Sequence, residues 1–175
     1  MSNAITEARG VFPIPCVGKG DKAAIFYVHS QGVIAEVGLR IIEFHVHTSA
    51  VVPISGRDDG HFFLLQLEPG GKDVWKIKHI DNQGFPEFKE AGIPDALLPA
   101  SAERFGIEIW SQPAGRANMG TTLRTQNFRV EARGQSERNE LATRMWERIR
   151  DRLNKYRVIH DEMNNVYGLV RGAGR

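Results

Sequence analysis

Residues Asn139–Arg148 read NELATRMWER and open the longest helix that the sequence predicts, which runs over about Glu137–Tyr156. Its apolar side chains recur every three or four residues and so share one face: they are Leu141, Ala142, Met145, Trp146, Ile149 and Leu153. Two apolar runs follow the helix, Arg157–His160 and Val166–Val170, with turn-forming residues between them. This pattern predicts a C-terminal β-hairpin.

The N-terminal half is rich in strand-forming residues. Stretches dominated by Val, Ile and aromatic residues predict strands: Ala23–Val28, Val33–His47, His61–Glu68 and Val74–Ile80. Turns are expected at Ser30–Gly32 and Pro69–Gly71, because glycine and proline favour tight turns. The stretch from His61 to Glu68 is apolar almost throughout, which is typical of a central strand. Short connections between successive strands indicate antiparallel pairing.

The middle of the chain predicts a second helix and two more strands. Helical runs lie at Asp95–Leu98 and Ala102–Phe105, on either side of Pro99. The expected strands are Ile107–Trp110 and Leu123–Val130. We therefore expect one α+β domain over residues 1–175, with a largely antiparallel twisted sheet and two main helices from the C-terminal half. Residues 1–22 are expected to be an irregular N-terminal segment.

Composition and charge limit the kinds of site and the cellular location that the chain can have. The formal net charge is +2, too small to indicate nucleic-acid binding by itself. Cys16 is the only cysteine, so the chain forms no internal disulfide and no cysteine-based zinc site. No apolar run reaches the length of a transmembrane helix or a signal core. We expect a cytoplasmic protein without membrane association; the sequence leaves its oligomeric state open.

Residues 74–170 resemble the GNAT superfamily of N-acetyltransferases in the order strand, glycine-containing loop, helix, strand, helix, hairpin. Three stretches carry the resemblance: KEAGIPDALL at Lys89–Leu98, the strand Ile107–Trp110, and Asn139-x-x-Ala142-x-x-Met145-Trp146-Glu147. The first is similar to the family's phosphate-binding segment, where free N–H groups at a helix start cradle the pyrophosphate of coenzyme A. The second is similar to the strand that splays from its neighbour to admit this cofactor, and the third to the helix beside the pantetheine arm.

The resemblance implies an acyl-CoA cofactor and transfer of its acyl group to a small-molecule or peptide amine. Gly92, Ile93 and Ala96 would meet the pyrophosphate and Lys89 would supply charge. Asn139 and Trp146 would line the pantetheine side. The chain departs from the family at Pro94, which stands at the second glycine. It departs again at Trp146, which replaces a tyrosine that protonates the leaving thiolate.

Two carboxylates are candidates for the base that deprotonates the amine. Glu68 ends an apolar strand, where burial could raise the pKa of its carboxyl. Glu108 lies in the short strand Ile107–Trp110. Both are chosen from their placement in the GNAT-like order of elements, since the sequence shows no paired-carboxylate motif.

Histidine spacing offers a metal-site alternative. His45 and His47 are two residues apart on a predicted strand and so face one side, and His61 on the next strand could join them. This spacing resembles the cupin His-x-His motif, but no glutamate follows at the expected distance. A surface strand is the better interpretation, and we expect no metal.

A non-enzymatic alternative rests on the basic helix. From Glu137 to Arg157 the chain has seven Lys or Arg and four Asp or Glu. Arg144, Arg148, Arg152 and Lys155 fall on or near one face, which could contact phosphates of nucleic acid or a protein partner. The interleaved acids favour an ordinary solvated face instead.

Overall fold

The computed structural model describes residues 10–34, 40–50, 61–111, 144–150, 155–163 and 166–172. These residues form one eight-stranded sheet in the order β1-β2-β3-β4-β5-β6-β8-β7. The strands are β1 Gly10–Val17, β2 Ala23–Ile34, β3 Arg40–His47, β4 Phe63–Gly71, β5 Val74–Asp81, β6 Glu108–Trp110, β7 Tyr156–Asp161 and β8 Val166–Arg171. The helices are the 3₁₀ turn η1 Pro86–Phe88, α2 Ile93–Phe105 and a helical segment at 144–150. The predicted α+β class is confirmed.

The sheet is antiparallel except at one place. Strands β1 to β5 form a meander in which each strand pairs with the next. Strand β6 then pairs parallel to β5 after the crossover through α2. Strand β8 lies between β6 and β7 and is antiparallel to both, as the hairpin prediction requires. The predicted central position of β4 is confirmed by its pairing with β3 and β5.

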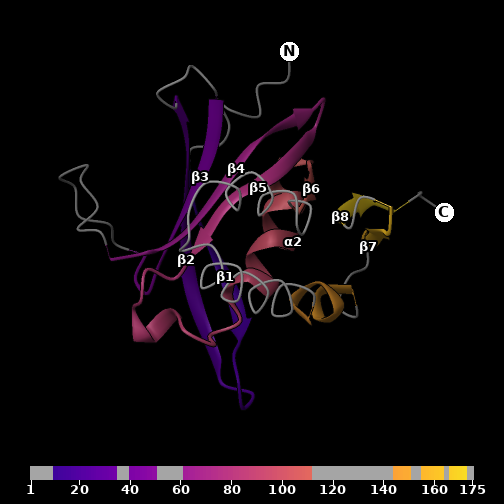
Figure 1. Cartoon of the computed structure of the whole chain (residues 1–175). Coiled ribbons are helices and arrows are strands. Elements are labelled where there is room, and N and C mark those ends of the chain that lie inside the picture. Colours follow the sequence, from indigo (N-terminus) through magenta and orange to yellow (C-terminus); the bar gives the residue numbers. More distant parts are fainter. Residues whose placement is uncertain are drawn as a thin grey trace, which may run out of the picture.

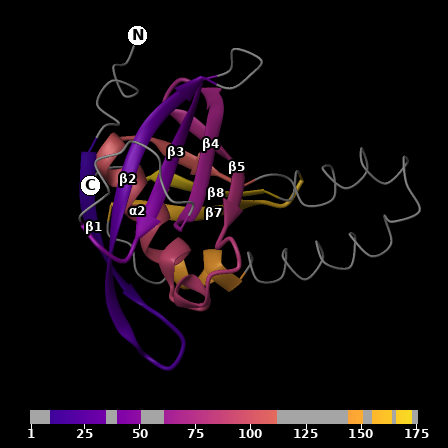
Figure 2. The same cartoon turned by 90° about the vertical axis from the view of Figure 1, so that its left-hand side faces the viewer.

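One face of the sheet, the inner face, carries the core. Buried side chains alternate along the strands, as in Phe63, Leu65 and Leu67 of β4. They pack in one cluster with the buried face of α2, which includes Ile93 and Leu97. The opposite, outer face carries the polar and half-exposed side chains. Figure 2 shows β1 to β5 as a twisted layer with α2 behind it.

The sheet curls around α2 so that both of its edge strands contact this helix. At the first edge, the ring of Phe12 in β1 meets that of Phe105 at 6.4 Å between centroids. At the other edge, the Tyr156 hydroxyl in β7 donates a hydrogen bond of 2.8 Å to the carbonyl oxygen of Ala102. Figure 1 accordingly shows α2 between the strands β1 to β5 and the β7–β8 hairpin.

Helix α2 is continuous across Pro99, where the sequence predicts two shorter runs. Pro94 lies in its first turn, where a missing N–H does no harm. Gly92 and Gly106 flank the helix in the left-handed conformation, with φ of 73° and 62°. Pro99 removes one internal hydrogen bond, and the buried apolar face holds the helix together despite that loss.

The predicted irregular segment 1–22 is wrong for Gly10–Val17, which forms β1. Pro13 and Pro15 argue against a strand, but β1 lies at the sheet edge and needs donors on one side only. The two prolines are two residues apart, so their missing N–H groups fall on the same edge. An edge strand can accommodate both.

Three predicted boundaries differ from the structure. The turn expected at Ser30–Gly32 is wrong, because Gln31–Ile34 continue β2 and pair with β3; the predicted strand Val33–His47 is therefore divided between β2, which ends at Ile34, and β3, which begins at Arg40. The turn expected at Pro69–Gly71 lies instead at Lys72 and Asp73, where Asp73 has a φ of 57°. The long helix does not reach Tyr156, which begins β7. The strand predicted at Leu123–Val130 lies outside the described residues.

Within the described ranges, no helix has the length and apolar character needed to cross a membrane.

Candidate functional site

The parallel pair β5–β6 is the part of the fold with an unusual geometry. Pairing joins Val74 to Glu108, Trp75 to Ile109 and Lys76 to Trp110. After Lys76, β5 continues to Asp81 with pairing to β4, whereas β6 ends at Trp110. Within the described ranges, residues 77–81 therefore have a strand partner on one side only. We call this place the β5–β6 divergence.

Side chains from three strands surround the divergence. On the inner face, Ile77 and Tyr167 are partly buried against the core. On the outer face, the indole of Trp110 covers Gly168, and a Cβ added there would lie 2.7 Å from the ring. The backbone of Ser111 is fixed to β8 because its N–H donates to the Tyr167 carbonyl at 2.8 Å. Strand β6 thus follows β8 rather than β5.

The predicted bases, Glu68 and Glu108, are both half-buried, and both lie on the outer face of the sheet. Glu68 lies in β4 opposite Lys76, at the level where β5 and β6 part. Glu108 lies at the start of β6, within the paired part, and its N–H donates to the Asp73 carbonyl at 2.8 Å. Strand β5 separates the two carboxylates.

The predicted phosphate-contacting residues lie at the start of α2. Lys89 is exposed, whereas Ile93 is fully buried in the core and Ala96 is partly buried. Gly92 packs directly on β1: a Cβ there would come within 2.2 Å of the Val17 carbonyl oxygen. Lys89 is the residue of this set with an exposed side chain.

The predicted pantetheine-side residues are only partly described. Asn139 lies outside the described residues. Trp146 is 1% exposed and stacks in parallel on Tyr167, with ring centroids 6.1 Å apart. The His160 ring stacks on Tyr167 as well, at 4.3 Å. Trp146 therefore lies on the inner face with α2, while Glu68 and Glu108 lie on the other side of the sheet.

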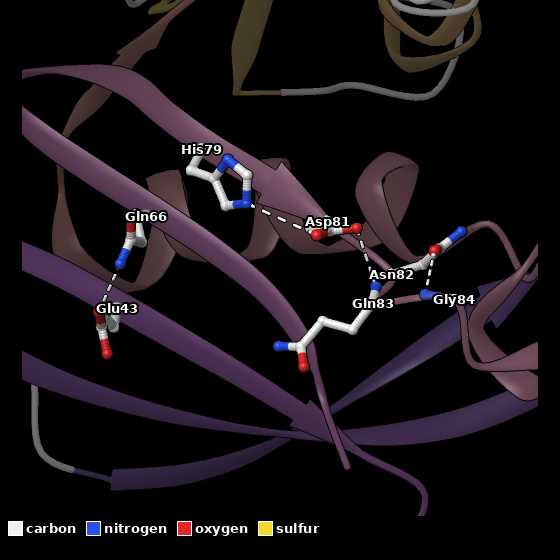
Figure 3. A network of polar contacts seen from close by, with 7 residues as sticks. All are labelled: Glu43, Gln66, His79, Asp81, Asn82, Gln83 and Gly84. Carbon is white, nitrogen blue, oxygen red and sulfur yellow. Dashed lines mark hydrogen bonds and ion pairs between the residues drawn. The ribbon is translucent and has the colours of Figure 1, made fainter. Parts of the chain in front are cut away.

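A polar network on the outer face was not predicted (Figure 3). His79 Nε2 lies 3.7 Å from the carboxylate of Asp81 at the end of β5. One strand away, Gln66 Nε2 donates to Glu43 at 2.5 Å, and His45 Nε2 lies 3.0 Å from the same carboxylate. His79 reaches this face because the β4–β5 register shifts between Gln66 and Leu67. Simple alternation from Ile77 would place it inward.

The same region includes two of the histidines of the metal alternative. His45 stacks on Phe62 at 4.0 Å, and His47 lies 5.2 Å from the His29 ring. His61 instead stacks on Phe85 and contacts the carboxylate of Glu87. In the described part of the chain, no group of three or more His, Cys, Asp or Glu could hold a metal ion.

A second unpredicted contact joins the two helical elements. Asp95, in the first turn of α2, accepts hydrogen bonds from Arg148 Nε at 2.5 Å and Nη2 at 2.9 Å. The Asp95 side chain is 5% exposed, and its carboxylate raises the pKa of Arg148. Burial, with a smaller effect of Asp95, raises the pKa of the Cys16 thiol to about 12. Cys16 is therefore not a nucleophile at neutral pH.

Two basic residues of the face predicted for the C-terminal helix form ion pairs in the described residues. Arg148 is paired with Asp95, and Lys155 with Glu103 at 2.7 Å. Arg144 is exposed, and Arg152 lies outside the described residues.

Comparison of the chain with protein-family models, curated proteins and solved structures finds no match.

Proposed function

We propose that the chain is a divergent GNAT-like protein that binds an acyl-CoA, with the pantetheine arm lying along β5 at the β5–β6 divergence. The observation that carries this proposal is the parallel pair that ends after Lys76 and Trp110. Beyond Lys76, the edge of β5 that points away from β4 has no neighbouring strand among the described residues. The amides of a pantetheine arm supply both donors and acceptors, so an extended ligand can pair with the backbone along such an edge.

The order of elements supports the same proposal. Strand β5 leads through α2 to the parallel β6, then to the helical segment 144–150 and the β7–β8 hairpin. The family resemblance implies this order. Strand β8 lies between β6 and β7. The β7–β8 hairpin therefore extends the sheet on the β6 side of the divergence.

The phosphate end of the ligand falls near the start of α2. A ligand that follows β5 toward Asp81 reaches the loop 82–92, which leads directly into this helix. The N-terminus of a helix favours anions through its dipole, although Asp95 occupies part of this field. The exposed Lys89 then provides the charge for the pyrophosphate, while Gly92, Ile93 and Ala96 shape the segment behind it.

Acyl transfer is the second part of the proposal. A base removes a proton from the ammonium group, and the amine nitrogen attacks the thioester carbonyl carbon. The C–S bond then breaks and the thiolate takes up a proton. Glu68 is the carboxylate placed level with the divergence and is our first candidate for the base. Glu108 and His79 are the other candidates, and His79 Nε2 lies near the carboxylate of Asp81.

The acyl-CoA proposal is favoured over contact of the basic helix face with nucleic acid by the ion pairs on that face. The charges of Arg148 and Lys155 are already matched by Asp95 and Glu103.

Titration calorimetry and thermal shift with CoA and acetyl-CoA test the binding claim. CoA should raise the melting temperature with concentration, because a ligand of the native state stabilises it by mass action. Lys89→Glu should weaken binding by about tenfold, since it places a negative charge beside the pyrophosphate. Lys72→Glu, the same charge change at an exposed turn, should leave binding unaltered. No heat and no shift at millimolar CoA would overturn the proposal.

A further inference from the structure

Among the strands that the structure describes, β1 and β7 lie at the two edges of the sheet, and these edges differ in their ability to pair with another strand. Strand β1 carries Pro13 and Pro15, which remove backbone donors from one edge. Strand β7 at the opposite edge, Tyr156–Asp161, has no proline and pairs with β8 along its whole length. An edge strand presents a row of backbone donors and acceptors that can accept a further strand.

The inner side chains of β7 are committed to the fold. Tyr156 is bonded to Ala102 of α2, and Val158 packs against the core. His160 stacks on Tyr167 of β8. These contacts fix which way the strand faces, so its other three side chains lie on the outer face.

The outer side chains of β7 are Arg157, Ile159 and Asp161, in a basic, apolar, acidic order. Their neighbours across β8 are the uncharged residues Val170, Gly168 and Val166. The order is self-complementary, because reading it in the opposite direction exchanges the two charges. Antiparallel pairing of two identical strands makes this exchange.

We propose that β7 pairs antiparallel with β7 of a second copy of this chain, about a two-fold axis at Ile159. Arg157 then lies opposite the partner's Asp161, and Asp161 opposite the partner's Arg157. The interface uses the same surface on both copies and is closed, as a two-fold dimer requires. The two sheets become continuous, and the backbone ladder supplies the association while the charge pairs set the register.

Charge selects this register over its neighbours. The axis must keep outer residues opposite outer residues, so the register can change only in steps of two. A shift in one direction places Arg157 opposite the partner's Ile159, and a shift in the other places it opposite the partner's Met163. Neither brings the two opposite charges together. Asp161 Oδ1 already accepts the Met163 N–H at 3.1 Å, which orients the carboxylate, and a carboxylate accepts more than one hydrogen bond.

Sedimentation of the full chain over a concentration series tests the dimer. The wild-type chain should show a reversible monomer–dimer equilibrium. Arg157→Asp should raise the dimer dissociation constant by at least about tenfold, because two carboxylates then oppose each other twice. Lys72→Asp, the same change in an exposed turn, should not alter it.

Charge exchange makes the test specific to this register. Asp161→Arg should also be monomeric, yet an equimolar mixture of Arg157→Asp and Asp161→Arg chains should form a heterodimer. The double variant carrying both changes should regain the homodimer, which excludes misfolding as the cause of the single-variant result. A wild-type chain that stays monomeric, a dimer unaffected by Arg157→Asp, or a mixture that stays monomeric would each overturn the proposal.

Discussion

At the scale of single residues, the Asp95–Arg148 pair is a polar contact that joins the two helical elements. Asp95 is buried, and both of its oxygens are bonded to a guanidinium supplied from another helical element. A buried carboxylate is tolerated when it is fully hydrogen-bonded and strongly destabilising when its partner is removed. The pair therefore fixes the helical segment 144–150 against the start of α2.

Removing the guanidinium should lower stability more than the loss of an exposed arginine does. We expect Arg148→Met to reduce the free energy of unfolding by about 2–3 kcal/mol in urea denaturation; this is below the usual range for a buried pair because Arg148 is half exposed. Arg144→Met, one helical turn away and exposed, is the matched control. In an Asp95→Asn background the Arg148→Met change should have a smaller effect. Equal losses for the two arginine variants would contradict this role.

At the scale of elements, hydrophobic alternation was sufficient to predict most strands. The hairpin β7–β8, the strands β4 and β5 and the helix around Leu97 follow from their patterns of apolar residues. Strand β1 could not be predicted because Pro13 and Pro15 are compatible with a strand only at an edge, and edge position is a property of the whole sheet. The residue type of Gly32 favours a turn, yet Gly32 lies in β2 because cross-strand pairing with Ile42 outweighs its weak strand preference.

The candidate site was harder to predict because the face of the sheet on which a side chain lies depends on strand pairing and tertiary structure. A single irregularity between β4 and β5 moves His79 to the outer face, and no residue type marks it. Asp95 and Arg148 are 53 residues apart in the chain, so their meeting is invisible to local patterns. The family resemblance implies that Glu68 and Trp146 belong to one site, but they lie on opposite faces of the sheet.

The contact between Trp110 and Gly168 holds β6 to β8, and a small substitution should break it. Gly168→Ala adds a Cβ within 2.7 Å of the indole, so either the ring or strand β8 must shift. We expect a loss of about 1–3 kcal/mol, as for other overpacked sites, measured by denaturant unfolding. The same substitution in a Trp110→Ala background should have little effect. A Gly168→Ala loss that persists without the indole would show that the ring is not the cause.

The loop between β5 and α2 should respond to pH through Glu87. Its own backbone N–H, and then the hydrogen bond from His61, lower the pKa of its carboxyl. Since folding lowers this pKa, the ionised form stabilises the native loop above the pH at which glutamate titrates in the unfolded chain. This contribution is lost as pH falls through the lowered pKa.

Carbon-detected NMR titration of Glu87 measures this directly. The native midpoint should lie below that of an unstructured glutamate, and His61→Ala should raise it only in part, because the backbone hydrogen bond remains. A native midpoint at or above the ordinary value would contradict the contact.

At the scale of the whole molecule, the sheet curls around α2 and leaves one parallel pair that separates after three residue pairs. The meander β1 to β5 lies on one side of this separation and the β8–β7 hairpin on the other. The helix start and the exposed Lys89 lie at the end of the loop that leaves β5. An extended ligand with amides in its middle and phosphates at its end fits this arrangement, which is the reason for proposing acyl-CoA.

Amide hydrogen exchange with and without CoA tests this central claim most directly. If the pantetheine arm pairs with β5, CoA should slow exchange at those amides of Ile77–Asp81 whose N–H points away from β4, toward the side that no described strand covers. Exchange in Arg40–His47 of β3, which is paired on both sides over most of its length, should be unchanged. Binding of CoA without any slowing at Ile77–Asp81 would contradict the account.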